Sequence, residues 1–423
     1  MRRFSARNAA IVIAGAIAAA LACALAPPAG AADPPIRIGL GMAQTGPLAA
    51  NGKSALLAMQ IWKDTINAKG GLLGRPVELV VYDDQSQPST VPGIYTKLLD
   101  VDKVDLVVSG YGTNVIAPAM PVIIQHKRTF LSLFGLAVNH QFHYPNYFTI
   151  TPTGPDAAIS STVGFFEVGA MQNPKPETLA IVAADAEYPR TSAEGVRTNA
   201  KKFGWKVVYD KTYPPATTDY SPVIRAVQAA NPDAVYVASY PLDTVGIVRA
   251  ANEVGLKTKL FGGGMVGLQT TSVKQELGPL MNGIVNYDFW IPAKTMQFPG
   301  VLDFLKLYQS KAPAAGVDPL GYYLAPWAYA YMTVLADAVE GAHGLDQQKI
   351  ADYLRSHTFK TIMGDIAFGP DGELSEPHTL MVQYQHLKGN GLDQFNTGDN
   401  PVILWPAKYA DGKALYPYTE ARQ

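Results

Sequence analysis

The chain has 423 residues, of which 48% are hydrophobic and 16% are charged, and its formal charge at pH 7 is −1. This composition excludes an intrinsically disordered chain, which combines low hydrophobicity with high net charge. The near balance of 34 basic and 35 acidic residues also argues against a nucleic-acid-binding protein. The length accommodates two or three domains of about 150 residues each.

Residues 1–32 have the layout of an export signal. Three arginines lie within the first seven residues, an almost wholly apolar stretch covers 9–26, and a Pro-Pro pair breaks it. Small residues follow, so we expect cleavage after Ala31 or Ala32 and a periplasmic location. A transmembrane anchor is the alternative, but the apolar run is short and rich in alanine.

The single cysteine, Cys23, lies inside this segment. A lipoprotein signal would place leucine three residues before it, where Ala20 stands, so we do not expect lipidation. The mature chain then has no cysteine and no disulfide, and core burial alone must stabilise it. No later run of 18 uncharged apolar residues exists, so we expect no membrane span after the signal.

Strand-like apolar runs alternate with helix-length patterns along the rest of the chain. Expected strands cover 36–42, 77–81, 106–108 and 129–133, with helices over 54–67, 91–99 and 117–125 between them. The series then restarts, with strands over 179–183, 206–209, 234–238 and 259–261 and helices over 192–203, 223–230 and 244–253. Later helices are expected over 302–309 and 328–340, and late strands over 363–368 and 380–384. The alternation predicts an α/β fold of two doubly wound lobes with parallel sheets.

Motifs of the common enzyme classes are missing. The mature chain has no nucleophilic cysteine, no Gly-x-Ser-x-Gly elbow, no His-Glu-x-x-His helix and no phosphate-loop lysine. His140 and His143 have a metal-like interval but no evident third ligand, so we expect no metal and no cofactor. The Asp83-Asp84 pair is interpreted as a strand end or cap, with acid–base catalysis as the alternative.

Glycine-rich loops follow several strands of the first lobe, where ligands bind in parallel sheets. Candidate ligand-binding residues are Tyr111, Gly112 and Thr113 after the third strand and Phe134, Gly135, Leu136 and Ala137 after the fourth. Glycines let backbone N–H groups approach a ligand, and a helix start suits a carboxylate. Alternatively, Thr113 only caps its helix.

The second lobe offers tyrosines and one acid at comparable positions, namely Tyr188, Tyr220, Tyr240 and Asp243. Asp243 precedes the helix expected over 244–253, so it either accepts a ligand ammonium group or serves as the N-cap. The tyrosines either wall an apolar group or belong to the core.

The chain resembles periplasmic solute-binding proteins of the branched-chain amino-acid type, which serve ABC importers. The resemblance rests on Gly46-Pro47, the run Ile-Asn-Ala-Lys-Gly-Gly-Leu-Leu-Gly at 66–74, the Val-Val-Tyr-Asp-Asp run at 80–84, residues 110–118 and the Val-Gly-Leu-Lys-Thr run at 254–258. It extends over essentially the whole mature chain and implies two αβ lobes joined by three crossovers. Lobe 1 would comprise 33–149 and 290–360, and lobe 2 would comprise 150–289 and 361–423.

The resemblance also implies site roles. Thr113 matches the hydroxyl that holds the ligand carboxylate, 135–137 match its backbone donors, Tyr188 matches an aromatic wall residue, and Asp243 matches the acid for the amino group. Asn51 stands where some relatives place a tryptophan, and the cysteines of a disulfide frequent in relatives would fall at Ser86 and Gly112. Because of Asn51, leucine should not be assumed as the ligand, and Tyr111 and Phe134 favour an aromatic one.

The expected function is therefore that of a monomeric receptor that binds a small amino acid or amino-acid-like ligand and delivers it to an ABC permease and its ATPase. An aromatic or aliphatic carboxylate is the alternative ligand. An exported αβ hydrolase or amidase is the alternative of another class, and a sensory module would need a fused signalling segment.

Overall fold

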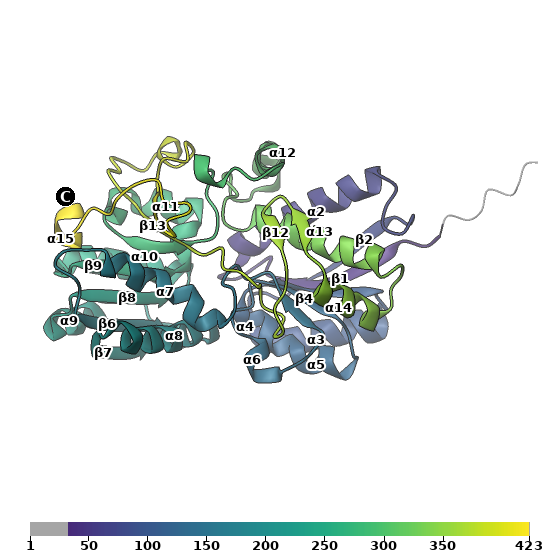
Figure 1. The fold of residues 1–423 in the computed structure, drawn as a ribbon, viewed down its shortest axis with the longest axis horizontal. Helices are drawn as coiled ribbons and strands as arrows, with labels where there is room; N and C mark the ends of the chain where they lie inside the picture. The colour runs from purple at the N-terminus through teal and green to yellow at the C-terminus, as the bar shows by residue number, and fades with distance from the viewer. Residues whose placement is uncertain (1–32, 423) are drawn as a thin grey trace, which may run out of the picture.

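The computed structural model describes residues 33–422 and arranges them in two lobes, each built around one β-sheet (Figure 1). The expected export signal, with Cys23, lies outside the described residues. Within 33–422, no helix is both long and apolar enough to cross a membrane. The expected α/β fold with two parallel-stranded sheets is confirmed.

The first sheet is parallel throughout and has the strand order β2-β1-β3-β4-β5. Its strands are β1 (Ile36–Met42), β2 (Val77–Asp83), β3 (Leu106–Tyr111), β4 (Phe130–Leu133) and β5 (Tyr147–Thr149). The helical segments among them are α2 (Ala49–Ala68), η1 (Pro88–Thr90), α3 (Val91–Thr96), η2 (Lys97–Val101), α4 (Thr113–Ile116), η3 (Ala117–Ala119), α5 (Met120–Gln125) and α6 (Asn139–Phe142). The central strands β3 and β4 are wholly buried, as expected where helices cover both faces of a parallel sheet.

The second sheet has seven strands in the order β14-β13-β10-β9-β8-β6-β7. Its strands are β6 (Thr178–Ala184), β7 (Lys206–Tyr213), β8 (Ala234–Ser239), β9 (Leu260–Met265), β10 (Val285–Asp288), β13 (Leu380–Gln383) and β14 (Val402–Trp405). The helical segments around it are α7 (Ala157–Ala170), α8 (Glu187–Phe203), α9 (Ser221–Ala230), α10 (Pro241–Val254), η4 (Val266–Gln269), α11 (Thr271–Leu277), η5 (Gly278–Met281), η7 (Leu392–Gln394) and α15 (Tyr418–Ala421). Strand β13 runs antiparallel to both of its neighbours, so β13 and β14 add an antiparallel edge to this sheet.

The chain passes between the sheets three times. It leaves the first sheet after β5, leaves the second after β10, and returns to the second ahead of β13. The middle passage contains η6 (Lys294–Met296) and leads to α12 (Val301–Ala315), α13 (Ala325–Gly341), α14 (Gln347–Ser356) and the small β11 (Phe359–Thr361) and β12 (Gly364–Ile366) pair. Helices α12 and α13 pack on α2, so they belong with the first sheet. We call the first sheet with its helices lobe 1 and the second sheet with its helices lobe 2.

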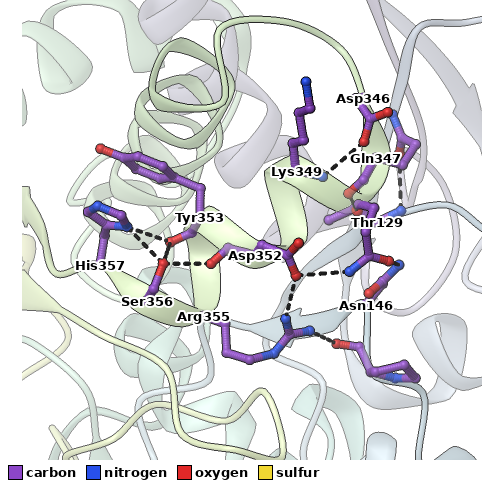
Figure 2. Close-up of polar contacts among 12 residues, drawn as sticks. Thr129, Asn146, Asp346, Gln347, Lys349, Asp352, Tyr353, Arg355, Ser356 and His357 are labelled. Atoms are coloured by element: carbon purple, nitrogen blue, oxygen red, sulfur yellow. Dashed lines mark hydrogen bonds and ion pairs between the residues drawn. The ribbon is translucent and has the colours of Figure 1, made fainter.

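Helix α14 is fastened to lobe 1 by polar contacts (Figure 2). The Asp346 carboxylate caps the helix by accepting the Lys349 N–H at 2.9 Å. The Gln347 side chain accepts the backbone N–H of Thr129 at 3.0 Å, just before β4. Arg355 at the other end donates to the Pro145 carbonyl at 2.6 Å. These bonds hold the returning chain against the amino end of the first sheet, opposite the strand ends that carry the site.

One expected helix is interrupted. The apolar pattern predicts a single helix over 117–125, whereas the structure divides this range into η3 and α5, directly after α4. Pro118 and Pro121 each lie at the first positions of a new segment. Proline has no N–H and blocks the helical hydrogen-bond ladder, so the chain restarts at each one.

Candidate functional site

A cavity of about 40 Å³ lies between the lobes, where the carboxyl ends of strands from both sheets meet. Lobe 1 contributes Tyr111, Gly112, Thr113, Phe134, Leu136 and Tyr323. Lobe 2 contributes Ser161, Tyr188, Ser192, Tyr236, Tyr240, Val266 and Tyr287, and the crossing segments contribute Thr151, Thr153 and Phe289. We call this cavity the aromatic pocket.

Stacked and edge-on rings form one wall of the aromatic pocket. The Phe134 ring meets Phe289 at 5.0 Å and Tyr323 at 5.5 Å between centroids, both edge-on. Phe289 and Tyr323 are stacked at 5.9 Å with an interplanar angle of 13°. On the lobe 2 side, Tyr188 and Tyr240 lie 5.7 Å apart. Rings prefer such offset and edge contacts with other rings, so the walls suit a flat aromatic guest.

Tyrosine hydroxyls connect the two lobes across the floor of the pocket. The Tyr323 hydroxyl contacts that of Tyr111 at 3.3 Å and that of Tyr287 at 3.2 Å. Tyr111 and Tyr323 belong to lobe 1, whereas Tyr287 lies in β10 of lobe 2. Burial raises the pKa of Tyr287 to about 12, and it raises that of Tyr323 as well. These phenols are therefore neutral near pH 7.

Two buried hydroxyls in the pocket have no hydrogen-bond partner. They are the Tyr240 hydroxyl of lobe 2 and the Thr153 Oγ1 of the first crossing. Leaving a buried polar group unpaired costs about 1–3 kcal/mol, so native structures pair nearly all of them. The two hydroxyls therefore mark where a polar part of a ligand would bind.

No charged side chain lines the aromatic pocket among the residues that the structure describes. Its polar groups are hydroxyls, from tyrosine, serine and threonine, together with backbone. A hydroxyl can donate to a carboxylate or accept from a hydroxyl, but it does not neutralise an ammonium group. A buried ammonium without an opposite charge is costly. The lining therefore fits a neutral or acidic aromatic compound better than a zwitterion.

The loop after β4 is held in a strained shape beside this lining. Phe134 and Ala137 have positive φ angles of 61° and 53°, which side-chain-bearing residues seldom adopt. The Thr113 Oγ1 accepts the Leu136 N–H at 3.1 Å, which ties this loop to the start of α4. A Cβ at Gly135 would lie 2.6 Å from the Tyr147 hydroxyl, so only glycine fits there. Such strain is typical of ligand-binding loops.

Seven of the expected site residues line the aromatic pocket, and four do not. Those that line it are Tyr111, Gly112, Thr113, Phe134, Leu136, Tyr188 and Tyr240. Gly135 lies within the loop between Phe134 and Leu136, and Ala137, Asp243 and Asn51 line other cavities. The sequence did not indicate the crossing residues Thr151, Thr153 and Phe289, the distant Tyr287 and Tyr323, or Ser161, Ser192, Tyr236 and Val266 of lobe 2. Their only sequence signal is a high local density of aromatic and hydroxyl residues.

Asp243 lies in a separate crevice at the edge of the lobes, which we call the mouth crevice. This crevice is lined by Pro47, Leu48 and Asn114 from lobe 1 and by Tyr220, Tyr240, Leu242 and Asp243 from lobe 2, with others. The helix expected to start at Thr244 begins earlier, at Pro241, because proline is favoured in the first turn. Asp243 therefore lies inside the first turn of α10.

The Asp243 carboxylate has partners within lobe 2. It accepts the Tyr213 hydroxyl at 3.1 Å and the backbone N–H of Tyr240 at 3.4 Å. Burial raises the pKa of Asp243, and these two hydrogen bonds oppose that shift. Tyr240 lines both cavities and so stands between this carboxylate and the aromatic pocket.

The acidic pair after β2 holds a loop. Asp83 accepts the backbone N–H groups of Gln44 and Thr45 and the Thr45 hydroxyl, the last at 2.7 Å. Burial would raise the pKa of Asp83, but these bonds and one from Gln85 outweigh it, so the pKa is lowered. The interpretation as a strand-end cap fits these contacts. Over residues 33–422, no group of three or more His, Cys, Asp or Glu is arranged to hold a metal ion.

Comparison with known proteins agrees with this architecture. The family model described as periplasmic binding protein matches residues 35–387. The leucine-, isoleucine-, valine-, threonine- and alanine-binding protein of Pseudomonas aeruginosa is 26% identical over 340 residues, which cover 80% of this chain and 87% of that protein.

Two solved structures show the same fold. The substrate-binding protein LivJ of Streptococcus pneumoniae, in complex with isoleucine, has a TM-score of 0.72 at 19% identity, covering 88% of this chain and 100% of that chain. A solute-binding protein of R. palustris, in complex with 4-hydroxybenzoate, has a TM-score of 0.72 at 18% identity, covering 84% of this chain and 94% of that chain. The resemblance found in the sequence is confirmed, and the chain belongs to the periplasmic binding protein family.

Proposed function

We propose that the chain is the ligand-binding receptor of an ABC importer and that its ligand is a small aromatic acid held in the aromatic pocket. Members of this family bind solutes, and the chain is a receptor rather than an enzyme. The proposal extends to the importer itself: a permease and its ATPase receive the ligand, and the receptor acts as an exported monomer cleaved near residues 31–32. An intact mass that begins at residue 32 or 33 would support that cleavage.

The observation that carries the ligand class is the uncharged, ring-lined pocket with two unpartnered hydroxyls. An aromatic ring would contact Phe134, Phe289 and Tyr323, while a carboxylate would accept hydrogen bonds from Tyr240 and Thr153. Hydrogen bonds to an ionised group are stronger than neutral ones, which favours an acid over a neutral phenol. The structure in complex with 4-hydroxybenzoate is one neighbour in keeping with this class.

A small amino acid is the second candidate, and the sequence relatives favour it. The relative from Pseudomonas aeruginosa binds branched-chain and other small amino acids by its name. Its ammonium group would need a carboxylate, and the nearest candidate is Asp243 on the far side of Tyr240. That reading requires Tyr240 to move, because its side chain lies between Asp243 and the pocket.

Binding would act through lobe closure. Only the closed arrangement brings Tyr111 and Thr113 of lobe 1 opposite Tyr188 and Tyr240 of lobe 2. A ligand that contacts both sets shifts the population towards the closed form by its differential affinity for that form. The importer would then distinguish loaded from empty receptor by shape.

Titration calorimetry with a matched panel tests the ligand class. The panel contains 4-hydroxybenzoate, benzoate, phenylalanine and leucine, each titrated into wild type and Asp243→Asn. We expect the two aromatic acids to bind tightest and with equal affinity in both proteins. Tighter binding of leucine or phenylalanine, weakened tenfold or more by Asp243→Asn, would replace the aromatic-acid proposal with the amino-acid one. Chemical analysis of recovered ligand should find it unchanged.

A further inference from the structure

A third cavity between the lobes is lined by two residues whose buried amide oxygens have no hydrogen-bond partner. It is small, with a volume of about 10 Å³, and is bounded by α2 and the segment before α13 on lobe 1 and by η4 and the start of α11 on lobe 2. We call it the interlobe cavity. Tyr323 lines both this cavity and the aromatic pocket, so its side chain separates them. The proposed function above makes no use of this cavity.

Two side-chain amides lining the cavity have unpartnered oxygens. Gln269 of lobe 2 is 3% exposed, and its Nε2 donates to the Tyr287 carbonyl at 2.8 Å, which fixes the orientation of the amide. Its Oε1 is buried without a partner. Asn51 of lobe 1 is also 3% exposed, and its Oδ1 is likewise buried without a partner. Unpaired carbonyl oxygens of this kind are rare in native interiors.

Two of the hydroxyls that line the cavity, those of Ser54 and Thr270, have their protons committed elsewhere. The Tyr308 hydroxyl donates to the Asp318 carbonyl at 3.0 Å, so in its 2.7 Å contact with Ser54 the Ser54 hydroxyl is the donor. The Thr270 hydroxyl donates to the Gly267 carbonyl at 2.8 Å. Both Ser54 and Thr270 can therefore offer only lone pairs to the cavity.

A carboxylate adds negative charge. The Asp318 Oδ1 accepts three hydrogen bonds, from the Thr271 hydroxyl and from two backbone N–H groups, but Oδ2 accepts only the Thr271 N–H at 2.8 Å. One lone pair of Oδ2 remains. The buried Lys274 is attracted by both Asp288 and Asp318 but does not line the cavity, so Asp318 is the one charged residue of the lining among the described residues.

We propose that the interlobe cavity binds one small monovalent cation, an alkali-metal or ammonium ion, when the lobes close. A water molecule can donate only two hydrogens, whereas the cavity presents oxygens from Asn51, Gln269, Ser54 and Asp318. Hard cations take several oxygen ligands, and a single carboxylate among neutral oxygens suits a single charge. The part of this inference that concerns closure rests on the proposed receptor function.

The consequence is a cation-dependent ligand affinity. Asn51 and Asp318 belong to lobe 1 and Gln269 to lobe 2, so an ion that contacts all three stabilises only the closed arrangement. Two ligands that both favour one conformation raise each other's affinity by the same factor. The cation would thus act as a co-ligand of the receptor.

Anomalous scattering from rubidium tests the site directly. Crystals of the protein grown in rubidium chloride should show an anomalous peak between Gln269 Oε1 and Asp318, and crystals of Gln269→Met should lack it. A cavity that holds only water gives no peak and overturns the proposal. This readout needs no organic ligand, so it remains decisive even if the proposed ligand class is wrong.

Thermal unfolding and calorimetry supply a second readout in sodium, potassium, ammonium and choline chloride at one ionic strength. We expect at least one small cation to raise the unfolding midpoint by about 2 °C or more over choline and to tighten binding of the best panel ligand. Asn51→Ala and Gln269→Met should abolish both differences. Asn199→Ala is the matched control, because its buried Oδ1 is also unpartnered but lies in lobe 2 away from the cavity. Equal midpoints and equal affinities in all four salts would contradict the proposal.

Discussion

The Asp318 carboxylate of lobe 1 accepts two hydrogen bonds from Thr271 of lobe 2, from its hydroxyl at 2.6 Å and from its backbone N–H at 2.8 Å. Thr271 is the first residue of α11, so the acid also lies at the positive end of a helix. At another point of the interface, Asn114 of lobe 1 accepts the backbone N–H of Tyr188 at 3.2 Å. These contacts hold the lobes closed on two sides of the aromatic pocket.

Breaking the first contact should weaken ligand binding without touching the pocket lining. In Asp318→Ala the closed state loses two charge-assisted hydrogen bonds, each worth about 1.5–3 kcal/mol, and we expect affinity to fall by about tenfold or more. Calorimetry measures the affinity, and small-angle scattering should show a more open average shape. Asp303→Ala, which removes an exposed acid on α12, should bind like wild type. Equal affinity of Asp318→Ala and wild type would exclude a role of this contact in closure.

The Tyr240 hydroxyl should matter for binding but not for folding. Tyr240→Phe removes a buried hydroxyl that has no partner, so the unfolding midpoint should stay the same or rise slightly. Ligand affinity should fall about fivefold to tenfold, because a hydrogen bond to an anionic ligand is lost.

Tyr331→Phe is the contrasting control. Its hydroxyl lies within 2.9 and 3.0 Å of the Ser109 and Leu131 carbonyls in the core of lobe 1 and does not line the pocket. It should lower the unfolding midpoint and leave affinity unchanged. If Tyr240→Phe behaves like Tyr331→Phe, the Tyr240 hydroxyl is structural and not directed at a ligand.

Gly135 should be replaceable only together with its neighbour. A methyl group in Gly135→Ala would meet the Tyr147 hydroxyl at 2.6 Å, which displaces the strained loop that carries Phe134 and Leu136. We expect weaker ligand binding and a lower unfolding midpoint, by about 1–3 kcal/mol in stability. The double variant Gly135→Ala/Tyr147→Phe removes the clashing oxygen and should recover part of the binding. A double variant no better than the single one would show that the clash is not the cause.

Glu373 should make stability fall as pH rises. Its side chain is fully buried in the third crossing, neither carboxylate oxygen has a partner, and burial, with the nearby Asp371 charge, raises its pKa well above the ordinary 4.5. The folded state therefore binds a proton on the Glu373 carboxyl group more tightly than the unfolded state does. The unfolding free energy must decrease as pH rises from about 4.5 through the raised folded pKa.

Glu373→Met tests this pH dependence. The unfolding free energy of the variant should change less with pH than that of wild type above about pH 4.5. At the upper end of the pH range the variant should be at least as stable as wild type. Denaturant titrations between pH 4 and pH 8, with exposed Glu376→Met as the control, measure the difference. A parallel decline in wild type and Glu373→Met would show that Glu373 does not titrate in the fold.

The sequence predicts the regular part of the fold well because its strands are short, apolar and separated by helical patterns. The first strand, 36–42, matches β1 at both ends, and the expected helices after β6, β7 and β8 are all present. Helices α7 and α14 escaped prediction, and several strands did so because they are too short to carry a pattern. Strands β5, β10 and β14 are only three or four residues long, and no local sequence pattern predicts that β14 pairs with β13.

The site was predictable only where it follows a strand in sequence. Tyr111 ends β3, and Thr113, Phe134 and Tyr240 follow β3, β4 and β8 within two residues, so the parallel-sheet rule indicates them. Tyr287, Phe289 and Tyr323 reach the pocket through the crossings and through packing of chain segments far apart in sequence. For Asp243 the sequence left open a ligand for an ammonium group or an N-cap; the helix begins at Pro241, and the carboxylate accepts the Tyr213 hydroxyl and the Tyr240 N–H.

A crystal structure of the protein grown with the tightest ligand of the calorimetric panel would show whether a small aromatic acid occupies the aromatic pocket. We expect density for the ligand between the lobes, with its ring against Phe134 and Phe289 and its acid group within hydrogen-bond distance of Tyr240 or Thr153. Ligand density in the mouth crevice beside Asp243, with the aromatic pocket unfilled, would contradict this expectation.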